Sequence, residues 1–281
     1  MTMMSLQILL PLNTFPGSNG ETFLDNALSV AAFLEGELEA LVLAADFRQV
    51  SNALGNLVLD VPSLVAGARE QCREKGAALL RSLKDQANVS GVRVRSSEIE
   101  CHPAVFSDRA TVASRYHDLV LMGLASSDDS LRSTAEAVIF GSGRPVMLLP
   151  EQHAIGRLDH VMVAWDGSRV AARAVNDARI VLERAEKVTI TVVVDEKTLP
   201  DQSLGARLAA YLTSHGLNVE HSEIRGAGRP IAGVLQDEAA RIGAGILVMG
   251  GFGHSRMRDF VLGGATRGIL ADLRMPVLLS H

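Results

Sequence analysis

Two clusters of glycine near the end of the chain could hold a phosphate group. Residues 250–253, Gly-Gly-Phe-Gly, follow an apolar run at 246–249, and Gly263-Gly264 forms the second cluster. Three basic residues lie between the clusters, namely His254, Arg256 and Arg258. Glycine lets the backbone approach an anion closely, and the N–H groups and dipole at a helix start favour negative charge. The arrangement favours an anion site; a strand-to-helix turn that uses glycine for its geometry alone is the alternative.

The spacing of the glycines is more specific than their number. Gly250, Gly253 and Gly263 fit the pattern G-x2-G-x9-G, which resembles the ATP-binding loop of the universal stress protein family. In that family the third glycine is usually followed by Ser or Thr, whereas Gly264 stands there in this chain. One hydroxyl ligand for phosphate is therefore missing, and Thr266, two residues further on, could partly replace it.

Apolar runs alternate with amphipathic segments along the whole chain. This alternation predicts an α/β protein whose parallel sheet is covered on both faces by helices. The strands are expected at residues 6–12, 38–45, 92–99, 117–122 and 146–149, and again at 160–165, 188–194, 217–224, 246–249 and 276–279. One unbroken helix is expected from Val170 to Leu182, with Ser168 as its N-cap.

The second half of the chain repeats the first. Three pairs of segments match at corresponding points of the pattern: 91–99 with 216–224, 118–123 with 245–250, and 144–149 with 275–279. Over nearly its whole length the chain resembles a tandem universal stress protein. The resemblance implies two domains, residues 1–150 and 151–281, joined by a polar linker from Pro150 to Leu158. Each domain would be a Rossmann-like, five-stranded parallel sheet in the order 3-2-1-4-5, similar to the adenine nucleotide alpha hydrolases.

Ligands of open α/β sheets bind beyond the carboxyl ends of the strands, where the strand order reverses. In the second half these ends supply Ala164-Trp165-Asp166 and the glycine loop. The resemblance implies that Asp166 lies near the nucleoside and that Val194, at the end of the second strand, meets the adenine. The predicted nucleotide site consists of Ala164, Trp165, Asp166, Val194, Met249, Gly250, Gly253, His254, Gly263, Gly264, Ala265 and Thr266.

Some of these residues have a second interpretation. Asp166 could be only a turn or capping residue before Ser168. Trp165 is as well suited to packing against a helix as to facing a ligand. His254 would make a weak contact with an anion, since it lies within the phosphate loop.

The first half differs at the equivalent positions. Asn13 replaces the acidic residue, and no glycine pair follows Gly123. Asp128 and Asp129 would repel a phosphate by like charge. We therefore expect the first half not to bind ATP and to act as a structural partner. The halves would pair through their last strands, at residues 146–149 and 277–279, because an unprotected sheet edge invites pairing.

Length and composition limit the class of protein. The 281 residues exceed the usual size of one domain. A net charge of −5 without a basic stripe argues against nucleic-acid binding. No apolar run is long enough to span a membrane, and residues 1–12 lack the features of a signal peptide, so a cytoplasmic protein is expected. Cys72 and Cys101 show no metal or disulfide spacing, and the histidines show no zinc pattern.

No P-loop, dinucleotide fingerprint or set of nucleophile, base and orienting residue is present. The first hypothesis is therefore a stress-response protein that binds ATP, or AMP or ADP, in its second half and regulates an interaction. Mg²⁺ could bind together with ATP, and the protein could form a homodimer. Slow ATP hydrolysis is the only catalytic activity expected. The second hypothesis is a scaffold that has lost nucleotide binding, and a third, weaker one is an enzyme acting on a nucleotide-like substrate.

Overall fold

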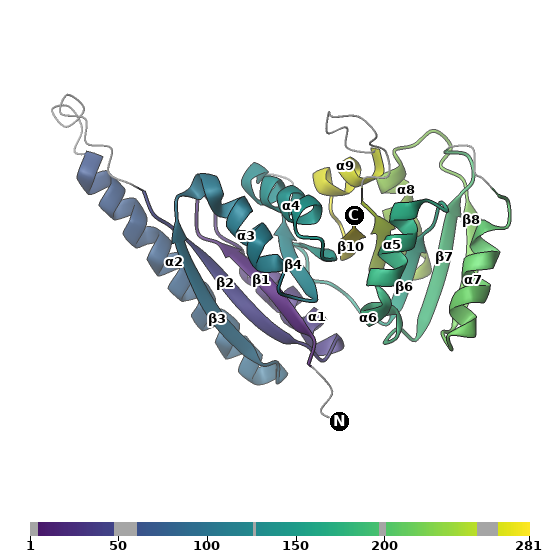
Figure 1. The fold of residues 1–281 in the computed structure, drawn as a ribbon, viewed down its shortest axis with the longest axis horizontal. Coiled ribbons are helices and arrows are strands. Elements are labelled where there is room, and N and C mark those ends of the chain that lie inside the picture. Colours follow the sequence, from purple (N-terminus) through teal and green to yellow (C-terminus); the bar gives the residue numbers. More distant parts are fainter. Residues whose placement is uncertain (1–4, 48–60, 126–127, 197–200, 252–263) are drawn as a thin grey trace.

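The computed structural model describes residues 5–47, 61–125, 128–196, 201–251 and 264–281. In this part of the chain ten strands form one sheet, in the order β3-β2-β1-β4-β5-β10-β9-β6-β7-β8 (Figure 1). Neighbouring strands are parallel except for β5 and β10, which are antiparallel. The sheet therefore consists of two five-stranded parallel halves, each in the expected order 3-2-1-4-5. The predicted α/β fold is confirmed.

The two halves contain matching elements. The N-terminal half contains β1 Gln7–Asn13, α1 Glu21–Phe33, β2 Glu37–Ala45, α2 Val61–Ser90, β3 Val94–Cys101, η2 Pro103–Val105, α3 Phe106–Ser114, β4 Leu119–Leu124, α4 Asp129–Gly141 and β5 Val146–Pro150. The C-terminal half contains β6 His160–Ala164, α5 Arg169–Asp177, α6 Arg179–Leu182, β7 Lys187–Val193, α7 Leu204–Ser214, β8 Val219–Ile224, α8 Ile231–Ile242, β9 Ile246–Gly250, α9 Gly264–Ala271 and β10 Val277–Ser280. No helix among the described residues is long and apolar enough to cross a membrane.

Each face of the sheet carries its own apolar layer. One layer packs the sheet against α1, α2, α5, α6 and α7, and the other packs it against α3, α4, α8 and α9. The central strands are almost continuously apolar because both of their faces are covered, as in β4, where every residue is buried. Figure 1 shows the two halves side by side, with the long helix α2 along the outer side of the N-terminal half.

The last strands of the two halves form the junction. Met147 of β5 lies opposite Leu278 of β10, and Leu148 lies opposite Val277. The rings of Phe140 and His281 meet edge to face across the same junction, with centroids 5.2 Å apart. These are the strands that the sequence placed at the contact between the halves, and their pairing removes two open sheet edges.

The segment after β5 is fastened to the N-terminal half by one buried side chain. Asn26 of α1 donates two hydrogen bonds from its Nδ2, to the carbonyl oxygens of Pro150 and His153, both at 2.9 Å. Its Oδ1 accepts a hydrogen bond from the Ile155 backbone N–H at 3.0 Å. Asn26 is 2% exposed, so a buried side chain of α1 ties down the expected linker at three backbone groups.

The structure corrects one expected element. The predicted helix from Val170 to Leu182 is two helices, α5 and α6, separated at Ala178. Ala178 has ψ of 0°, outside the α-helical range, and the N–H of Val181 bonds back to its carbonyl oxygen in a tighter turn. Apolar periodicity continues through such a turn, which is why the sequence pattern did not reveal it.

Candidate functional site

A crevice opens in the C-terminal half beyond the carboxyl ends of β6 and β9. These two strands are adjacent in the sheet, and the chain order reverses between them. The crevice is walled by the segment after β6, the start of α5, the first residues of α8 and the start of α9. This is the position at which open α/β sheets bind ligands.

The crevice brings together most of the predicted nucleotide site. The predicted residues that line it are Ala164, Trp165, Asp166, Met249, Gly250, Gly264, Ala265 and Thr266. In the place expected for Val194 the lining residues are Val193 and Glu196. The reason is strand alternation, since Thr191 and Val193 face the crevice side of β7 and Val194 faces away from it. Gly253, His254 and Gly263 lie outside the described residues.

Gly250 has a packing role at this site. A Cβ atom at this position would lie 2.7 Å from both the Ala171 nitrogen and the Val170 carbonyl carbon. Only glycine therefore allows the first turn of α5 to pack against the end of β9. The close approach is a structural reason for Gly250 that is independent of any ligand.

Asp166 has the turn role that the sequence left open. Its Oδ1 accepts a hydrogen bond from the Ser168 N–H at 2.9 Å, and the Ser168 hydroxyl accepts one from the Ala171 N–H at 3.2 Å. The two side chains thus shape and cap the start of α5, as expected of Asp and Ser at such positions. Both also line the crevice, so the turn and the predicted ligand contact involve the same residues.

Thr191 is a residue of the crevice that the sequence analysis missed. It is 1% exposed, it lines the crevice from β7, and its Oγ1 has no hydrogen-bond partner in the described part of the chain. Thr189, two residues earlier, bonds to both His160 and Glu220. The signal available in the sequence was a hydroxyl residue on the crevice side of an otherwise aliphatic strand end.

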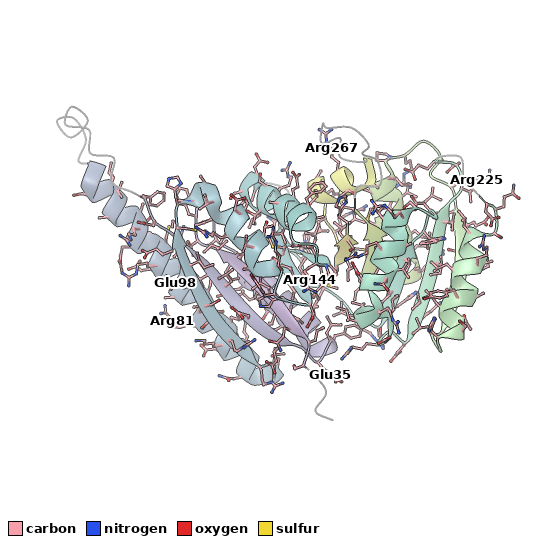
Figure 2. The ribbon with its side chains drawn as sticks, in the orientation of Figure 1. Glu35, Arg81, Glu98, Arg144, Arg225 and Arg267 are labelled. Atoms are coloured by element: carbon pink, nitrogen blue, oxygen red, sulfur yellow. The ribbon has the colours of Figure 1, made fainter. Side chains whose placement is uncertain are left out.

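The start of α9 forms the opposite wall. Gly264 has a φ outside the left-handed region, and a Cβ there would meet no atom of the described residues within 4 Å. Thr266 is buried, with 2% exposure, and borders the crevice. Figure 2 shows Arg267 of α9 and Arg225, which follows β8, on the same edge of the C-terminal half. Neither arginine lines the crevice, whose charged lining residues among those described are Asp166 and Glu196.

The corresponding place in the N-terminal half contains a carboxylate of the protein itself. Glu151 Oε2 accepts a hydrogen bond from the Gly20 N–H, the N-cap of α1, at 2.8 Å. Its Oε1 accepts one from Asn19 Nδ2 at 2.5 Å, and Asn19 is held in turn by the Asn13 N–H at 2.9 Å. Gly123, which matches Gly250, lies so close that a Cβ there would overlap the Glu151 carboxylate.

The surroundings of Glu151 change its ionisation. Burial raises the pKa of this carboxyl group above its ordinary value, and the negative charge of Asp128 raises it further. The hydrogen bonds from Gly20 and Asn19 act in the opposite direction, but the net pKa shift is upward. The corresponding place in the N-terminal half therefore holds a carboxyl group that is costly to keep charged.

Asp128 has a local structural role. Its Oδ1 accepts hydrogen bonds from the Ser130 and Leu131 N–H groups, at 2.9 and 3.1 Å, and so caps α4. The sequence analysis considered only its repulsion of phosphate. In the structure, α4 is the helix that corresponds to α9, and the N–H groups at its start are already bonded to the Asp128 carboxylate.

A metal site does not emerge from the described residues. No group of three or more His, Cys, Asp or Glu side chains among them is placed to hold a metal ion. Cys72 is buried, Cys101 is half-buried, and both are free thiols. Burial raises the pKa of the Cys101 thiol, which disfavours the reactive thiolate.

The fold and the crevice together define a doubly wound α/β protein with a ligand position at its strand-order reversal. Residues 157–281 match the model of the universal stress protein family. The C-terminal half of the chain therefore belongs to the universal stress protein family. None of the curated protein sequences compared matches the chain.

Two solved structures share the fold over nearly the whole chain. A universal stress protein from Archaeoglobus fulgidus is 18% identical, with a TM-score of 0.67, and the match covers 97% of this chain and 95% of that one. A proposed universal stress protein from Pseudomonas aeruginosa is 14% identical, with a TM-score of 0.57 and coverage of 98% and 92%. At these identities the likeness describes the fold.

Proposed function

We propose that the protein is a tandem universal stress protein that binds one adenine nucleotide per chain, in the crevice of its C-terminal half. ATP is the expected ligand, with ADP or AMP as alternatives. Binding would bias a conformation or an association, and the N-terminal half would serve as a structural partner. The proposal places the protein in the cytoplasm, in the stress response that its family membership indicates.

The observation that carries the proposal is the assembly of the crevice. Eight of the residues predicted from the sequence to contact nucleotide come from three separate segments and line one depression. The depression lies at the strand-order reversal, where nucleotides bind in folds of this class. Its wall includes the start of α9, whose N–H groups favour a negatively charged group.

The only tryptophan of the chain makes a direct test possible. Trp165 lines the crevice, so titration of the protein with ATP should change its fluorescence in a saturable way. Mass spectrometry of ligand released from the purified protein would identify the nucleotide. No change up to millimolar ATP, together with no bound nucleotide, would contradict the proposal.

A charge variant with a matched control locates the ligand. Gly264→Asp places a carboxylate in open space at the start of α9 and should weaken ATP binding by about tenfold or more, through like-charge repulsion. Gly67→Asp makes the same change of net charge on α2, where a Cβ also meets no atom within 4 Å. It should leave ATP binding unchanged. Equal effects of both variants would place the nucleotide elsewhere.

The competing function is a scaffold that does not bind nucleotide. The observation in its favour is the packing of Gly250, which accounts for this glycine without a ligand. The absence of a hydroxyl side chain at Gly264 favours the same alternative. The ATP titration separates the two functions, because a scaffold of this kind would show no saturable response.

A further inference from the structure

A second cavity lies in the C-terminal half, away from the nucleotide crevice. It is enclosed between α5, α6 and α7, on the face of the sheet opposite to α8 and α9. Its volume is about 320 Å³. We call it the helix cavity. None of its lining residues belongs to the crevice except Trp165, which borders both.

The interior of the helix cavity is apolar. Its walls include Val175, Leu182, Leu208 and Leu212, each less than 9% exposed, together with the half-buried Trp165. An apolar cavity of this size is costly when left without contacts, because the side chains around it lose their packing partners. Pockets with such a lining and volume are typical binding sites for small molecules.

The polar groups at the mouth of the cavity are already engaged with one another. Arg179 and Glu183 form an ion pair at 2.9 Å, and Asn176 donates a hydrogen bond to Asp177. The rings of Tyr211 and His215 meet edge to face, with centroids 4.8 Å apart. The mouth thus offers no unpaired charge among these groups to a charged ligand, because each charge at the mouth is balanced by its neighbour.

We propose that the helix cavity is a binding site for a small, neutral, largely aromatic molecule. The apolar walls disfavour a charged ligand, because the charge would lose its hydration on entering. The indole of Trp165 and the ring of Tyr211, which is 55% exposed at the mouth, favour a ligand with flat aromatic rings. The cavity lies on the other face of the sheet from α8 and α9 and shares with the nucleotide crevice only Trp165.

The test uses two probes that share one ring system. N-phenyl-1-naphthylamine is neutral, and 1-anilinonaphthalene-8-sulfonate carries the same rings with an added negative charge. Binding to the full-length protein is followed by energy transfer from Trp165 to each probe. The neutral probe should saturate at one per chain, and the sulfonate should bind at least about tenfold more weakly because its charge must be desolvated. Equal binding of the two probes would overturn the proposal.

A blocking variant and its control assign the site. Ala172 is an exposed residue of α5 at the cavity wall, so Ala172→Phe should fill the space without disturbing the core. It should weaken binding of the neutral probe by about tenfold or more, through lost apolar contact. Ala206→Phe makes the same change on an exposed part of α7 away from the cavity and should have no effect. Unchanged binding in Ala172→Phe, or no binding of the neutral probe to the natural protein, would refute the assignment and leave the ATP titration unaffected.

Discussion

The strand-order reversals of the two halves have the same topology and different surroundings. In the N-terminal half, Glu151 is bonded at the start of α1 and Asp128 caps α4. In the C-terminal half, the Asp166 carboxylate accepts the Ser168 N–H and the Ser168 hydroxyl caps the start of α5, and α9 begins with Gly264. In the same fold, therefore, the N–H groups at a helix start can bond to carboxylates of the protein itself, or the helix start can line a crevice where a ligand could bind.

The two halves also differ in how the polar side chains near these strand ends are hydrogen-bonded. Thr14, at the end of β1, donates its hydroxyl hydrogen to the Leu43 carbonyl oxygen at 2.7 Å, and Asn19 is bonded on both sides. Thr191, beside the C-terminal crevice, has no such partner in the described part of the chain. The polar groups of Thr14 and Asn19 are therefore bonded within the N-terminal half, whereas the Thr191 hydroxyl has no partner among the described residues.

The largest effect is expected from adding a methyl group at the matched glycines. Gly250→Ala should lower the free energy of unfolding by roughly 1–3 kcal/mol, because the new Cβ meets backbone atoms that cannot move aside. Gly123→Ala should cost less, because its Cβ meets the ends of the Glu151 and Asn19 side chains. Urea unfolding, followed by circular dichroism and by Trp165 fluorescence, measures both. A greater loss in Gly123→Ala would contradict the assignment of tight backbone packing to the C-terminal crevice.

A hydroxyl group added at Gly264 should strengthen ATP binding to the C-terminal half and so increase its difference from the N-terminal half. The position has a φ outside the left-handed region, and a Cβ there contacts none of the described residues, so Ser should fit without backbone strain. One added neutral hydrogen bond contributes roughly 0.5–1.5 kcal/mol, which tightens the ATP dissociation constant by about two- to tenfold. Calorimetric titration of Gly264→Ser measures the change.

Thr266 tests whether a neighbouring hydroxyl already has that role. If it does, Thr266→Ala should weaken ATP binding by a similar factor while Gly264→Ser has little effect. If neither variant changes the dissociation constant, the phosphates do not lie at the start of α9, and the scaffold function is favoured.

Two threonines test the division of polar groups. Thr14→Val should destabilise the protein by roughly 0.5–1.5 kcal/mol, because it removes a buried hydrogen bond. Thr191→Val removes a buried hydroxyl that has no hydrogen-bond partner among the described residues and should leave stability unchanged or raise it slightly. Urea unfolding without nucleotide compares them. A loss in Thr191→Val equal to that in Thr14→Val would show that Thr191 is bonded in the folded protein.

The smallest effect expected is a dependence of stability on pH. The pKa of Glu151 is raised in the folded protein by burial and by Asp128, so protonated Glu151 contributes stability that is complete below its ordinary pKa of 4.5. That contribution is lost as the pH rises through the folded-state pKa. The stability of the natural protein relative to Glu151→Gln should therefore fall as the pH rises above 4.5. A relative stability that stays constant or increases would show that the pKa is not raised.

The sequence predicted the fold because its signals are repeated and strong. Continuous apolar runs such as residues 119–124 predict buried parallel strands, and the matching segments of the halves fix the strand order. Finer features depend on contacts between distant residues. The hydrogen bonds of Glu151 to Gly20 and Asn19 join residues more than 130 positions apart, and no local sequence pattern predicts them. The break at Ala178 was missed because an apolar helix pattern continues across it.

The candidate site was predictable in its position and less so in its details. Strand ends and glycines located Trp165, Gly250 and Thr266, because the switch-point rule depends only on topology. The sequence did not determine which residues of β7 face the crevice, because a shift of one residue along a strand moves a side chain to the opposite face of the sheet. That offset is the difference between Val194 and the lining residue Val193.

The central claim is that one nucleotide binds per chain, in the C-terminal half. Calorimetric titration of the full-length protein with ATP tests it most directly, because the stoichiometry counts the crevices that bind. We expect one ATP per chain, with binding weakened by Gly264→Asp and unchanged by Gly67→Asp. Two ATP per chain would show that Glu151 does not keep the N-terminal half from binding nucleotide, and no binding would contradict the nucleotide function.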